Sequence, residues 1–207
     1  MKSFFYDWGG LNIWLFHAIN DVHSVALDAV MKLGSVLGDH ECFPLYLLVA
    51  VSCAWILVER AQYQSPDRMS VVARAWLMVL VVFCAAYVID GVVVAWLKQT
   101  LSFPRPVIAL PPDAIHPVLA PHDRHSLPSG HALFAATVTL SFWPVINRYG
   151  RAALVAFMLW VGLSRVSLGA HFPADVIAGY LLAAVVVLLL RFGVAGVTRY
   201  LKIIRPG

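Results

Sequence analysis

Three short stretches, far apart along the chain, carry side chains of the types that bind and transfer phosphate. They are Lys98 with Arg105-Pro106, Pro128-Ser129-Gly130-His131, and Ser164-Arg165 with His171 and Asp175. Together they supply three fixed cations, two imidazoles and a carboxylate. Arginine binds phosphate oxygens through paired N–H donors, and lysine adds a compact charge. Cations placed in this way stabilise the charge that develops on a transferring phosphoryl group.

The second stretch directly precedes an apolar run, which predicts a helix that begins there with Ser129 near its cap. The free N–H groups at a helix N-terminus, opened here by Gly130, favour a bound anion. His131 would then project from the first turn toward that anion. Taken alone, the stretch is better explained by an ordinary helix cap with a histidine at the level of the lipid headgroups.

The third stretch places a carboxylate four residues after a histidine. Arg165 ends one apolar run and Pro173 lies near the start of the next, so we expect Asp175 in the first turns of a helix. Asp175 can then reach one nitrogen of His171, fix the tautomer and leave the other nitrogen free as a nucleophile or base. The alternative is a structural pair that stabilises a helix start.

The remaining cations also have simpler interpretations. Lys98 could extend from the end of its span toward water, and Arg105 could bind lipid headgroups. The catalytic interpretation is favoured because these cations are expected to meet beside two histidines.

The elements that must position these groups are predicted to be membrane helices. The chain is 61% hydrophobic and 13% charged, with a mean hydropathy of +0.80, whereas soluble domains are about 25% charged. A span needs about 20 residues, and apolar runs of suitable length lie at about 42–59, 71–97, 130–147, 152–168 and 174–195. We therefore predict an all-α fold: a polytopic membrane helix bundle with five or six transmembrane helices, in a single domain over 1–207.

Residues 1–40 differ from these runs. The segments 11–19 and 25–37 are apolar on one face but are interrupted by charged or polar groups, namely Asp21, His23, Asp28 and Lys32. A span facing lipid tolerates such residues poorly. We expect N-terminal amphipathic helices that lie in the membrane interface, with a sixth, polar span packed against the bundle as the alternative.

Asp90 is an acid inside the apolar run 71–97, two helical turns before Lys98. Acids within a membrane are functional candidates by default. A supporting hydrogen bond beneath the site is an equally good interpretation, so Asp90 is not placed in the catalytic set.

The distribution of charge predicts an orientation. Nine of the fifteen cations lie in segments 59–74, 147–151 and 191–207, which the positive-inside rule places in the cytoplasm together with the C-terminus. The three polar stretches then lie on the outer face. This distribution explains the basic balance without nucleic acid. The connection 98–129 contains seven prolines and motif residues at both ends, which favours an ordered loop that faces the substrate.

The order and spacing of the motifs resemble a known family. Lys98-x6-Arg105-Pro106, Pro128-Ser129-Gly130-His131 and Ser164-Arg165-x5-His171-x3-Asp175 match the three signature motifs of the type 2 phosphatidic acid phosphatase (PAP2) superfamily at every signature position. The motif region covers about 98–175, and the helical layout extends the resemblance over most of the chain.

The resemblance implies a role for each motif residue. His171 would take the phosphoryl group as a phosphohistidine, Asp175 would orient it, and His131 would protonate the leaving oxygen. The implied phosphate-binding set is Lys98, Arg105, Ser129, the Gly130 amide and Arg165. The family needs no metal and no other cofactor, and the implied partners are a lipid phosphate and the bilayer.

These observations predict a bacterial integral-membrane lipid phosphatase, a phosphoric ester or anhydride hydrolase, at the outer face of the cytoplasmic (inner) membrane. We favour undecaprenyl diphosphate as substrate, released as the monophosphate for cell wall biogenesis. Phosphatidylglycerophosphate, phosphatidic acid and lipid A phosphate are alternatives, because the motifs bind only the shared phosphate. A lipid phosphotransferase and a non-catalytic lipid transporter are alternatives from other classes.

Overall fold

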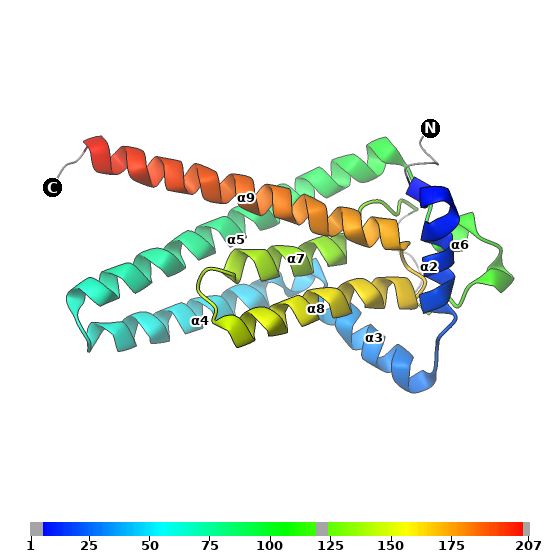
Figure 1. Cartoon of the computed structure of the whole chain (residues 1–207), viewed down its shortest axis with the longest axis horizontal. Helices are drawn as coiled ribbons and strands as arrows, with labels where there is room; N and C mark the ends of the chain where they lie inside the picture. The colour runs from blue at the N-terminus through cyan, green and yellow to red at the C-terminus, as the bar shows by residue number, and fades with distance from the viewer. Residues whose placement is uncertain (1–5, 119–123, 205–207) are drawn as a thin grey trace.

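The chain folds into a bundle of helices. The computed structural model describes residues 6–118 and 124–204, and these ranges contain helices and no strand. In chain order the 3-10 turns and α-helices are η1 (Trp8–Gly10), α2 (Leu11–Asn20), α3 (Val25–Leu37), η2 (His40–Cys42), α4 (Phe43–Gln62), α5 (Pro66–Leu101), α6 (Pro106–Ala109), η3 (Pro112–Ala114), α7 (Gly130–Phe142), α8 (Arg148–Ser167) and α9 (Pro173–Ile204). The long helices run roughly along one axis of the molecule (Figure 1).

Four segments of the described chain are long and apolar enough to cross a membrane. They are His40–Gln62, Pro66–Leu101, Arg148–Ser167 and Pro173–Gly196. These segments correspond to four of the apolar runs in the sequence, so the predicted all-α membrane bundle is confirmed. The predicted count of five or six spans is not confirmed, because the run at 130–147 forms a shorter helix.

That shorter helix, α7, has 13 residues and ends at Phe142. At about 1.5 Å per residue it is about 20 Å long, against a hydrocarbon core of about 30 Å. Pro144 has no N–H to continue the helix and its ring crowds the preceding turn, which explains the early end. Nearly every side chain of α7 is buried, as expected for a helix that is apolar on all sides. It is the central element, and α5, α8 and α9 pack around it.

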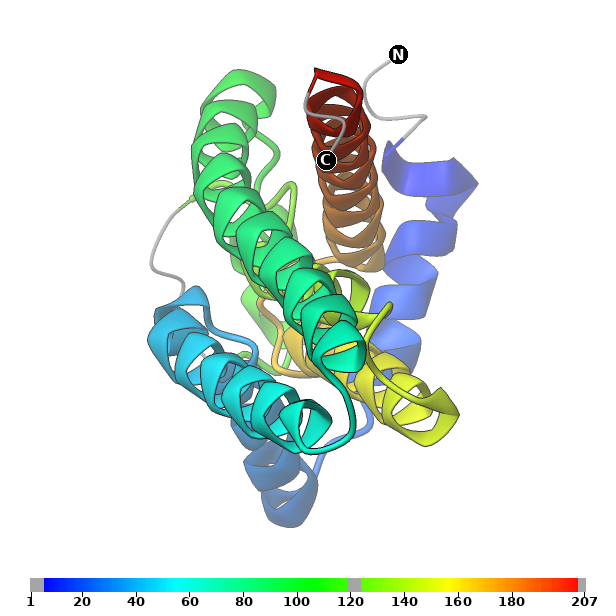
Figure 2. The same ribbon diagram turned by 90° about the vertical axis from the view of Figure 1, so that its left-hand side faces the viewer.

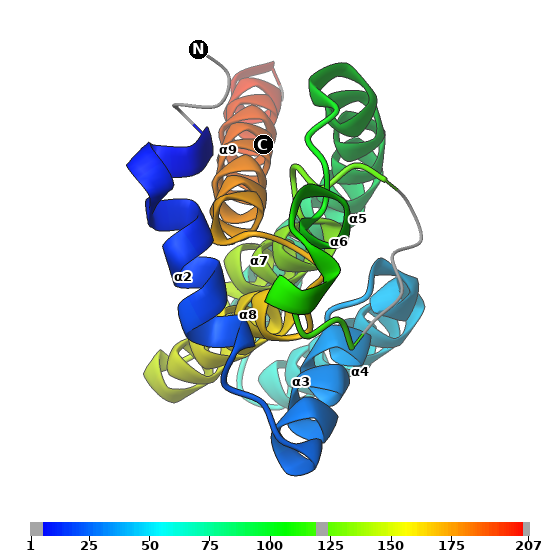
Figure 3. The same cartoon turned by 90° about the vertical axis from the view of Figure 1, so that its right-hand side faces the viewer.

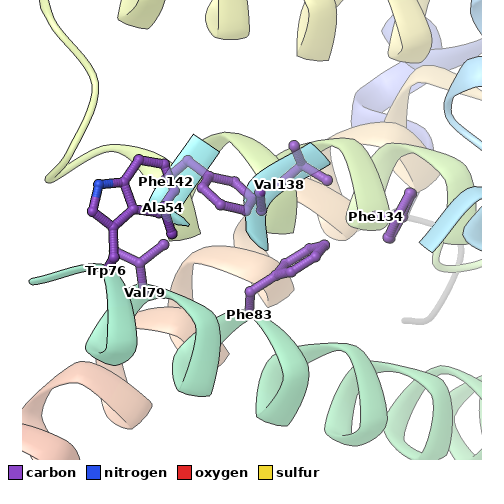
Figure 4. Close-up of a cluster of buried hydrophobic side chains, with 8 residues drawn as sticks. Ala54, Trp76, Val79, Phe83, Phe134, Val138 and Phe142 are labelled. Atoms are coloured by element: carbon purple, nitrogen blue, oxygen red, sulfur yellow. The ribbon is translucent and has the colours of Figure 1, made fainter. Parts of the chain in front are cut away.

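An aromatic core cluster holds α5 against α7. Figure 4 shows its side chains meeting between the two helices, next to small residues of α4. The rings of Phe83 and Phe142 lie 5.1 Å apart, a favourable distance for aromatic packing. The buried members are Ala50, Ala54, Trp76, Val79, Phe83, Phe134, Val138 and Phe142. This packing sets the position of the end of α5, where Lys98 lies, relative to the start of α7.

Helix caps form at the polar turns of the sequence. Ser65 accepts a hydrogen bond from the Arg68 N–H (3.1 Å) and is followed by a proline in the first helical turn. Asn147 caps α8 in the same way, through the Gly150 N–H at 2.9 Å. Each turn therefore reverses the chain between two antiparallel helices.

The two ends of the bundle differ in composition. The α4–α5 turn, the start of α8 and the C-terminal part of α9 lie toward one end (Figure 2). These elements contain the three segments rich in cations. The helices α2 and α6 lie at the opposite end (Figure 3). The separation of basic segments from motif segments that the sequence indicated is therefore present in the fold.

The N-terminal region forms two short helices. α2 has 10 residues and α3 has 13, each fewer than the about 20 of a span. α2 lies across the end of the bundle rather than along it, and α3 packs against α8 (Figures 1 and 3). Asn20 fixes the region to the rest of the chain, because its amide donates to the carbonyls of Ser167 (2.9 Å) and His116 (3.0 Å).

The connection 98–129 contains α6 and η3, and residues 119–123 lie outside the described chain. Its two halves are joined by the Ser126 N–H, which donates to the Phe103 carbonyl at 2.8 Å, and by a bridge between Pro104 and His125. This pairing brings Arg105 and Ser126 close together although they are distant in sequence.

Candidate active site

The buried pair His171–Asp175 lies where α8 is followed by α9. The Nδ1 atom of His171 is 3.4 Å from Oδ2 of Asp175, as the spacing predicted. The Phe172 N–H also donates to this oxygen, at 2.8 Å. The side chains of His171 and Asp175 are 2% and 0% exposed. The Asp175 carboxylate beside Nδ1 favours the tautomer with its proton on Nδ1 and the lone pair on Nε2.

Arg105 lies on the Nε2 side of the same imidazole. Its Nη1 atom is 3.3 Å from Nε2 of His171 and donates to the Ala170 carbonyl at 3.0 Å. Arg105 is buried and is the N-cap residue of α6. A phosphate oxygen bound by this guanidinium would be adjacent to Nε2.

Burial lowers the pKa of His171 to about 3. The hydrogen bond and charge of Asp175 oppose this shift, and the charges of Arg105 and Arg165 add to it. The imidazole is therefore neutral at neutral pH. A neutral ring is the form that can act as a nucleophile.

The N-terminus of α7 is held directly against the start of α9. Ser129 caps α7 by accepting from the Ala132 N–H at 3.5 Å, and its own N–H donates to the Asp175 carbonyl at 3.0 Å. A Cβ on Gly179 would lie 2.7 Å from the Ser129 carbonyl oxygen, so only glycine permits this approach. The space beside Gly130 is open, and its amide lies at the anion-favouring end of a helix.

Arg165 reaches the site from the last turn of α8. Its side chain is 7% exposed, and Nη1 donates to the Ser35 hydroxyl of α3. The Nε atom is buried and has no hydrogen-bond partner among the residues the structure describes. A buried N–H without an acceptor is costly, so this group is suited to bind an anionic oxygen.

His131 and Lys98 complete the predicted set. His131 lies in the first turn of α7, with Nε2 3.3 Å from Oδ2 of Asp39. Lys98 is half-buried in the last turn of α5. Deeper in the bundle, Asp90 of α5 accepts from the Thr137 hydroxyl of α7 at 2.5 Å. That contact ties α5 to α7 beneath the site, in agreement with the supporting role considered for Asp90.

Sequence reasoning missed the other contacts of Asp175. The Ser126 hydroxyl donates to Oδ2 and lies 3.3 Å from Nδ1 of His171, and the Tyr6 hydroxyl donates to Oδ1 at 2.7 Å. Burial and the Asp175 charge raise the pKa of Tyr6, so its hydroxyl remains a donor. Both residues are remote from Asp175 along the chain, and no spacing in the sequence indicated them.

Fold and contacts together define a membrane-helix protein whose buried histidine, arginines and helix N-terminus are suited to a phosphate group. The chain belongs to the PAP2 superfamily, because the model of that family matches residues 79–195, more than half of its length. The family resemblance predicted from the motifs is therefore confirmed.

Similarity to individual proteins extends beyond the motifs. The chain is 30% identical over 165 residues to a lipid A 1-phosphatase of Rhizobium etli, a match that covers 73% of this chain and 66% of the relative, slightly less than two thirds. It is also 30% identical over 184 residues to an undecaprenyl-diphosphatase of Sulfolobus acidocaldarius, covering 84% and 74%. The fold is similar to the crystal structure of a transmembrane PAP2 type phosphatidylglycerolphosphate phosphatase from Bacillus subtilis, with a TM-score of 0.64, 23% identity, and coverage of 95% of this chain and 89% of the other.

Proposed function

We propose that the protein is a membrane lipid phosphatase that works through a phosphohistidine on His171. The observation that carries this proposal is the position of the buried imidazole between two partners. Asp175 holds Nδ1, and the Arg105 guanidinium lies 3.3 Å from Nε2. A structural His–Asp pair needs no cation beside the free nitrogen. A histidine that attacks phosphorus does, because the cation binds the phosphate oxygens and stabilises their charge.

The proposed reaction has two steps. In the first, the Nε2 lone pair of His171 forms a bond to phosphorus, the bond to the lipid oxygen breaks, and His131 passes a proton to that oxygen. In the second, water attacks phosphorus, His131 accepts a proton from the water, and the N–P bond breaks with its electron pair returning to Nε2. His131 thus acts as general acid and then as general base.

The phosphate oxygens are proposed to be bound by Lys98, Arg105, Arg165, the Ser129 hydroxyl and the Gly130 amide. Two of these groups, Arg105 and Arg165, are buried arginines. Their fixed charges would stabilise the transferring phosphoryl group without the reorganisation that water requires.

An apolar groove supports a lipid as the substrate. It has a volume of about 580 Å³ and lies between α5 and α9, the two helices that carry Lys98 and Asp175. Its nearest lining residue on α9 is Val186, about 17 Å along the helix from Asp175. A lipid tail in this groove would remain at bilayer depth while its phosphate reached the site.

Undecaprenyl diphosphate is our first proposed substrate, because the chain resembles a named undecaprenyl-diphosphatase over 84% of its length. Lipid A 1-phosphate is the second candidate, supported by the similarity to the Rhizobium etli protein. Phosphatidylglycerophosphate and phosphatidic acid follow, since the proposed clamp contacts only phosphate.

We further propose that the site faces the exterior of the cytoplasmic membrane. The support is the segregation of nine cations to three segments remote from the motifs. A reporter fused to the C-terminus should then give a cytoplasmic signal, and a periplasmic signal would reverse the orientation.

The function is tested by phosphate release from purified protein with undecaprenyl diphosphate, lipid A, phosphatidylglycerophosphate and phosphatidic acid in turn. Release from at least one lipid is expected, with undecaprenyl diphosphate the most rapid. Release from none would overturn the proposal and favour a lipid transporter. Transfer of the phosphate to an added lipid or sugar alcohol rather than to water would identify a phosphotransferase.

A further inference from the structure

The N-terminal region contributes side chains to the site as well as covering it. Tyr6 donates to Asp175, Ser35 accepts from Arg165, and Asp39 contacts His131. Each of these three residues precedes α4, and each contacts a different member of the proposed machinery. The contacts of Tyr6 and Ser35 add a hydrogen bond to Asp175 and to Arg165, respectively. The third contact places the Asp39 carboxylate beside the imidazole of His131.

The Asp39 carboxylate is itself held in place. It caps η2, where Oδ1 accepts from the Glu41 N–H at 2.9 Å and lies 3.1 Å from Nδ1 of His40. This arrangement leaves Oδ2 directed at His131, with Nε2 at 3.3 Å. The hydrogen bond with His131 is the largest cause that holds the pKa of Asp39 well below its usual range. Asp39 is therefore an anion throughout the neutral range.

A general acid must carry its proton before the leaving group departs. An imidazolium has a proton on both nitrogens, and a carboxylate beside one nitrogen favours this form and fixes the ring. With Nε2–H directed at Asp39, the Nδ1 proton is the one that can pass to the leaving oxygen. Nδ1 then has a lone pair to accept a proton from water in the second step.

We infer that Asp39 is a positioning residue for His131, holding the ring through Nε2 so that Nδ1 exchanges protons with the leaving oxygen and the water. The inference rests on the proposed phosphatase function. It makes residues before α4 part of the machinery, although the three signature motifs lie between residues 98 and 175.

The charged and titratable groups that face His131 are Asp39 and His40 from the segment before α4, and Arg165 from α8. Burial lowers the pKa of His131, and Arg165 and His40 add to this shift, whereas the hydrogen bond and charge of Asp39 oppose it. Loss of the Asp39 charge should therefore lower the pKa of His131. The alkaline limb of the pH profile of kcat, where His131 loses its proton, should then move to lower pH.

The test compares Asp39→Asn with Glu41→Gln in the full chain. Both substitutions remove one negative charge from η2 or its cap, but the Glu41 side chain is exposed, and Glu41 contacts Asp39 through its backbone N–H, which Glu41→Gln keeps. We expect Asp39→Asn to lower kcat by about 10- to 100-fold with a small change in KM, because general acid catalysis contributes about 10²- to 10⁴-fold and a misaligned acid retains part of it. Glu41→Gln should match the wild type, and Asp39→Glu should recover part of the rate.

The leaving group provides a second readout that a purely structural role would not change. An aryl phosphate such as p-nitrophenyl phosphate has a stable leaving group and needs little protonation, whereas phosphatidic acid, an alkyl phosphate monoester, needs it. Asp39→Asn should therefore lose much more activity on phosphatidic acid than on the aryl ester, and the alkaline limb of its pH profile should shift by about one pH unit.

Equal loss on both substrates with an unshifted limb would overturn the inference, as would activity equal to that of Glu41→Gln. Absence of phosphate release by the wild-type protein would instead contradict the proposed function itself. The two failures are thus distinguishable, and the ratio of activities within one variant does not depend on how much of it folds.

Discussion

Two histidine–aspartate pairs have the same spacing and nearly the same geometry, yet they lie in opposite environments. His171 and Asp175 are 3.4 Å apart, and His17 of α2 and Asp21, which directly follows that helix, are 3.5 Å apart. The first pair is 2% and 0% exposed, and the second is 32% and 65% exposed. An exposed pair contributes little, because water competes for both groups. A spacing of four residues therefore places the two groups together, and the surroundings decide whether they form a dyad.

The surroundings of the buried pair are what a phosphoryl transfer requires. Asp175 accepts from the hydroxyls of Tyr6 and Ser126, and Arg105 lies at the free nitrogen of His171. Among the residues that the structure describes, His17 and Asp21 have no such partners, and their side chains are open to solvent. This contrast supplies matched controls, since each change in the buried pair has a counterpart of the same chemistry in the exposed one.

The largest effect is expected from His171→Ala. Loss of the proposed nucleophile should lower phosphate release by about 10⁴-fold or more, because the remaining groups bind the phosphate but cannot form the covalent intermediate. His17→Ala should stay within about twofold of the wild type, since an exposed pair contributes little. Undiminished turnover by His171→Ala would refute the nucleophile assignment.

Asp175→Asn tests the orientation of the imidazole and should cost less. An amide cannot hold the Nδ1 proton as a carboxylate does, so the wrong tautomer is populated and kcat should fall by about 10²- to 10⁴-fold. The control is Asp21→Asn, which should not change kcat. Trapping of phosphohistidine after rapid quench shows which step is slowed. If Asp175→Asn slows formation of the phosphohistidine, little of this intermediate should accumulate. A loss of only a few-fold would indicate that Asp175 is mainly structural.

The acid stability of the protein should report the burial of His171. Its pKa is about 3 in the folded state and near 6.5 when unfolded, so between these values the unfolded chain binds a proton that the folded chain does not. The contribution of this group to stability is fully present above pH 6.5 and is lost as the pH falls toward 3. The thermal midpoint of the wild type should drop over this window more steeply than that of His171→Gln, and parallel curves would contradict the prediction.

The smallest effect is expected from Tyr6→Phe. It removes one of the hydrogen bonds to Asp175 and keeps the ring, which stacks on Phe103 with centroids 4.2 Å apart. A single hydrogen bond is worth about 1 kcal/mol, so kcat should fall by about 3- to 10-fold. Tyr63→Phe is the control, because Tyr63 is exposed at the far end of the bundle. No change in Tyr6→Phe would show that Tyr6 does not support the catalytic role of Asp175.

Much of the fold could be predicted from local patterns. Four apolar runs became helices of spanning length, and the polar turns at 65–68 and 147–151 became capped helix starts. The run at 130–147 was predicted too long, because hydropathy does not register that Pro144 removes a helical hydrogen bond. A helix surrounded by other helices is as apolar as one surrounded by lipid, so composition does not distinguish them.

The candidate site, like the fold, could be predicted only in part. His171 and Asp175 could be paired in advance because four residues are one helical turn. Asp39 and His131 could not, since their contact depends on how the segment before α4 approaches the start of α7.

By itself, the sequence determined the membrane-helix class, the types of groups available for phosphate chemistry and the family to which they belong. These properties follow from composition and from short-range geometry, which the backbone dictates within a turn or two. Only the tertiary structure decided which pair is buried, which cation meets the free nitrogen and which remote residues support the acid and the carboxylate. Those features depend on packing between distant segments, such as the close approach that Gly179 allows between α9 and α7.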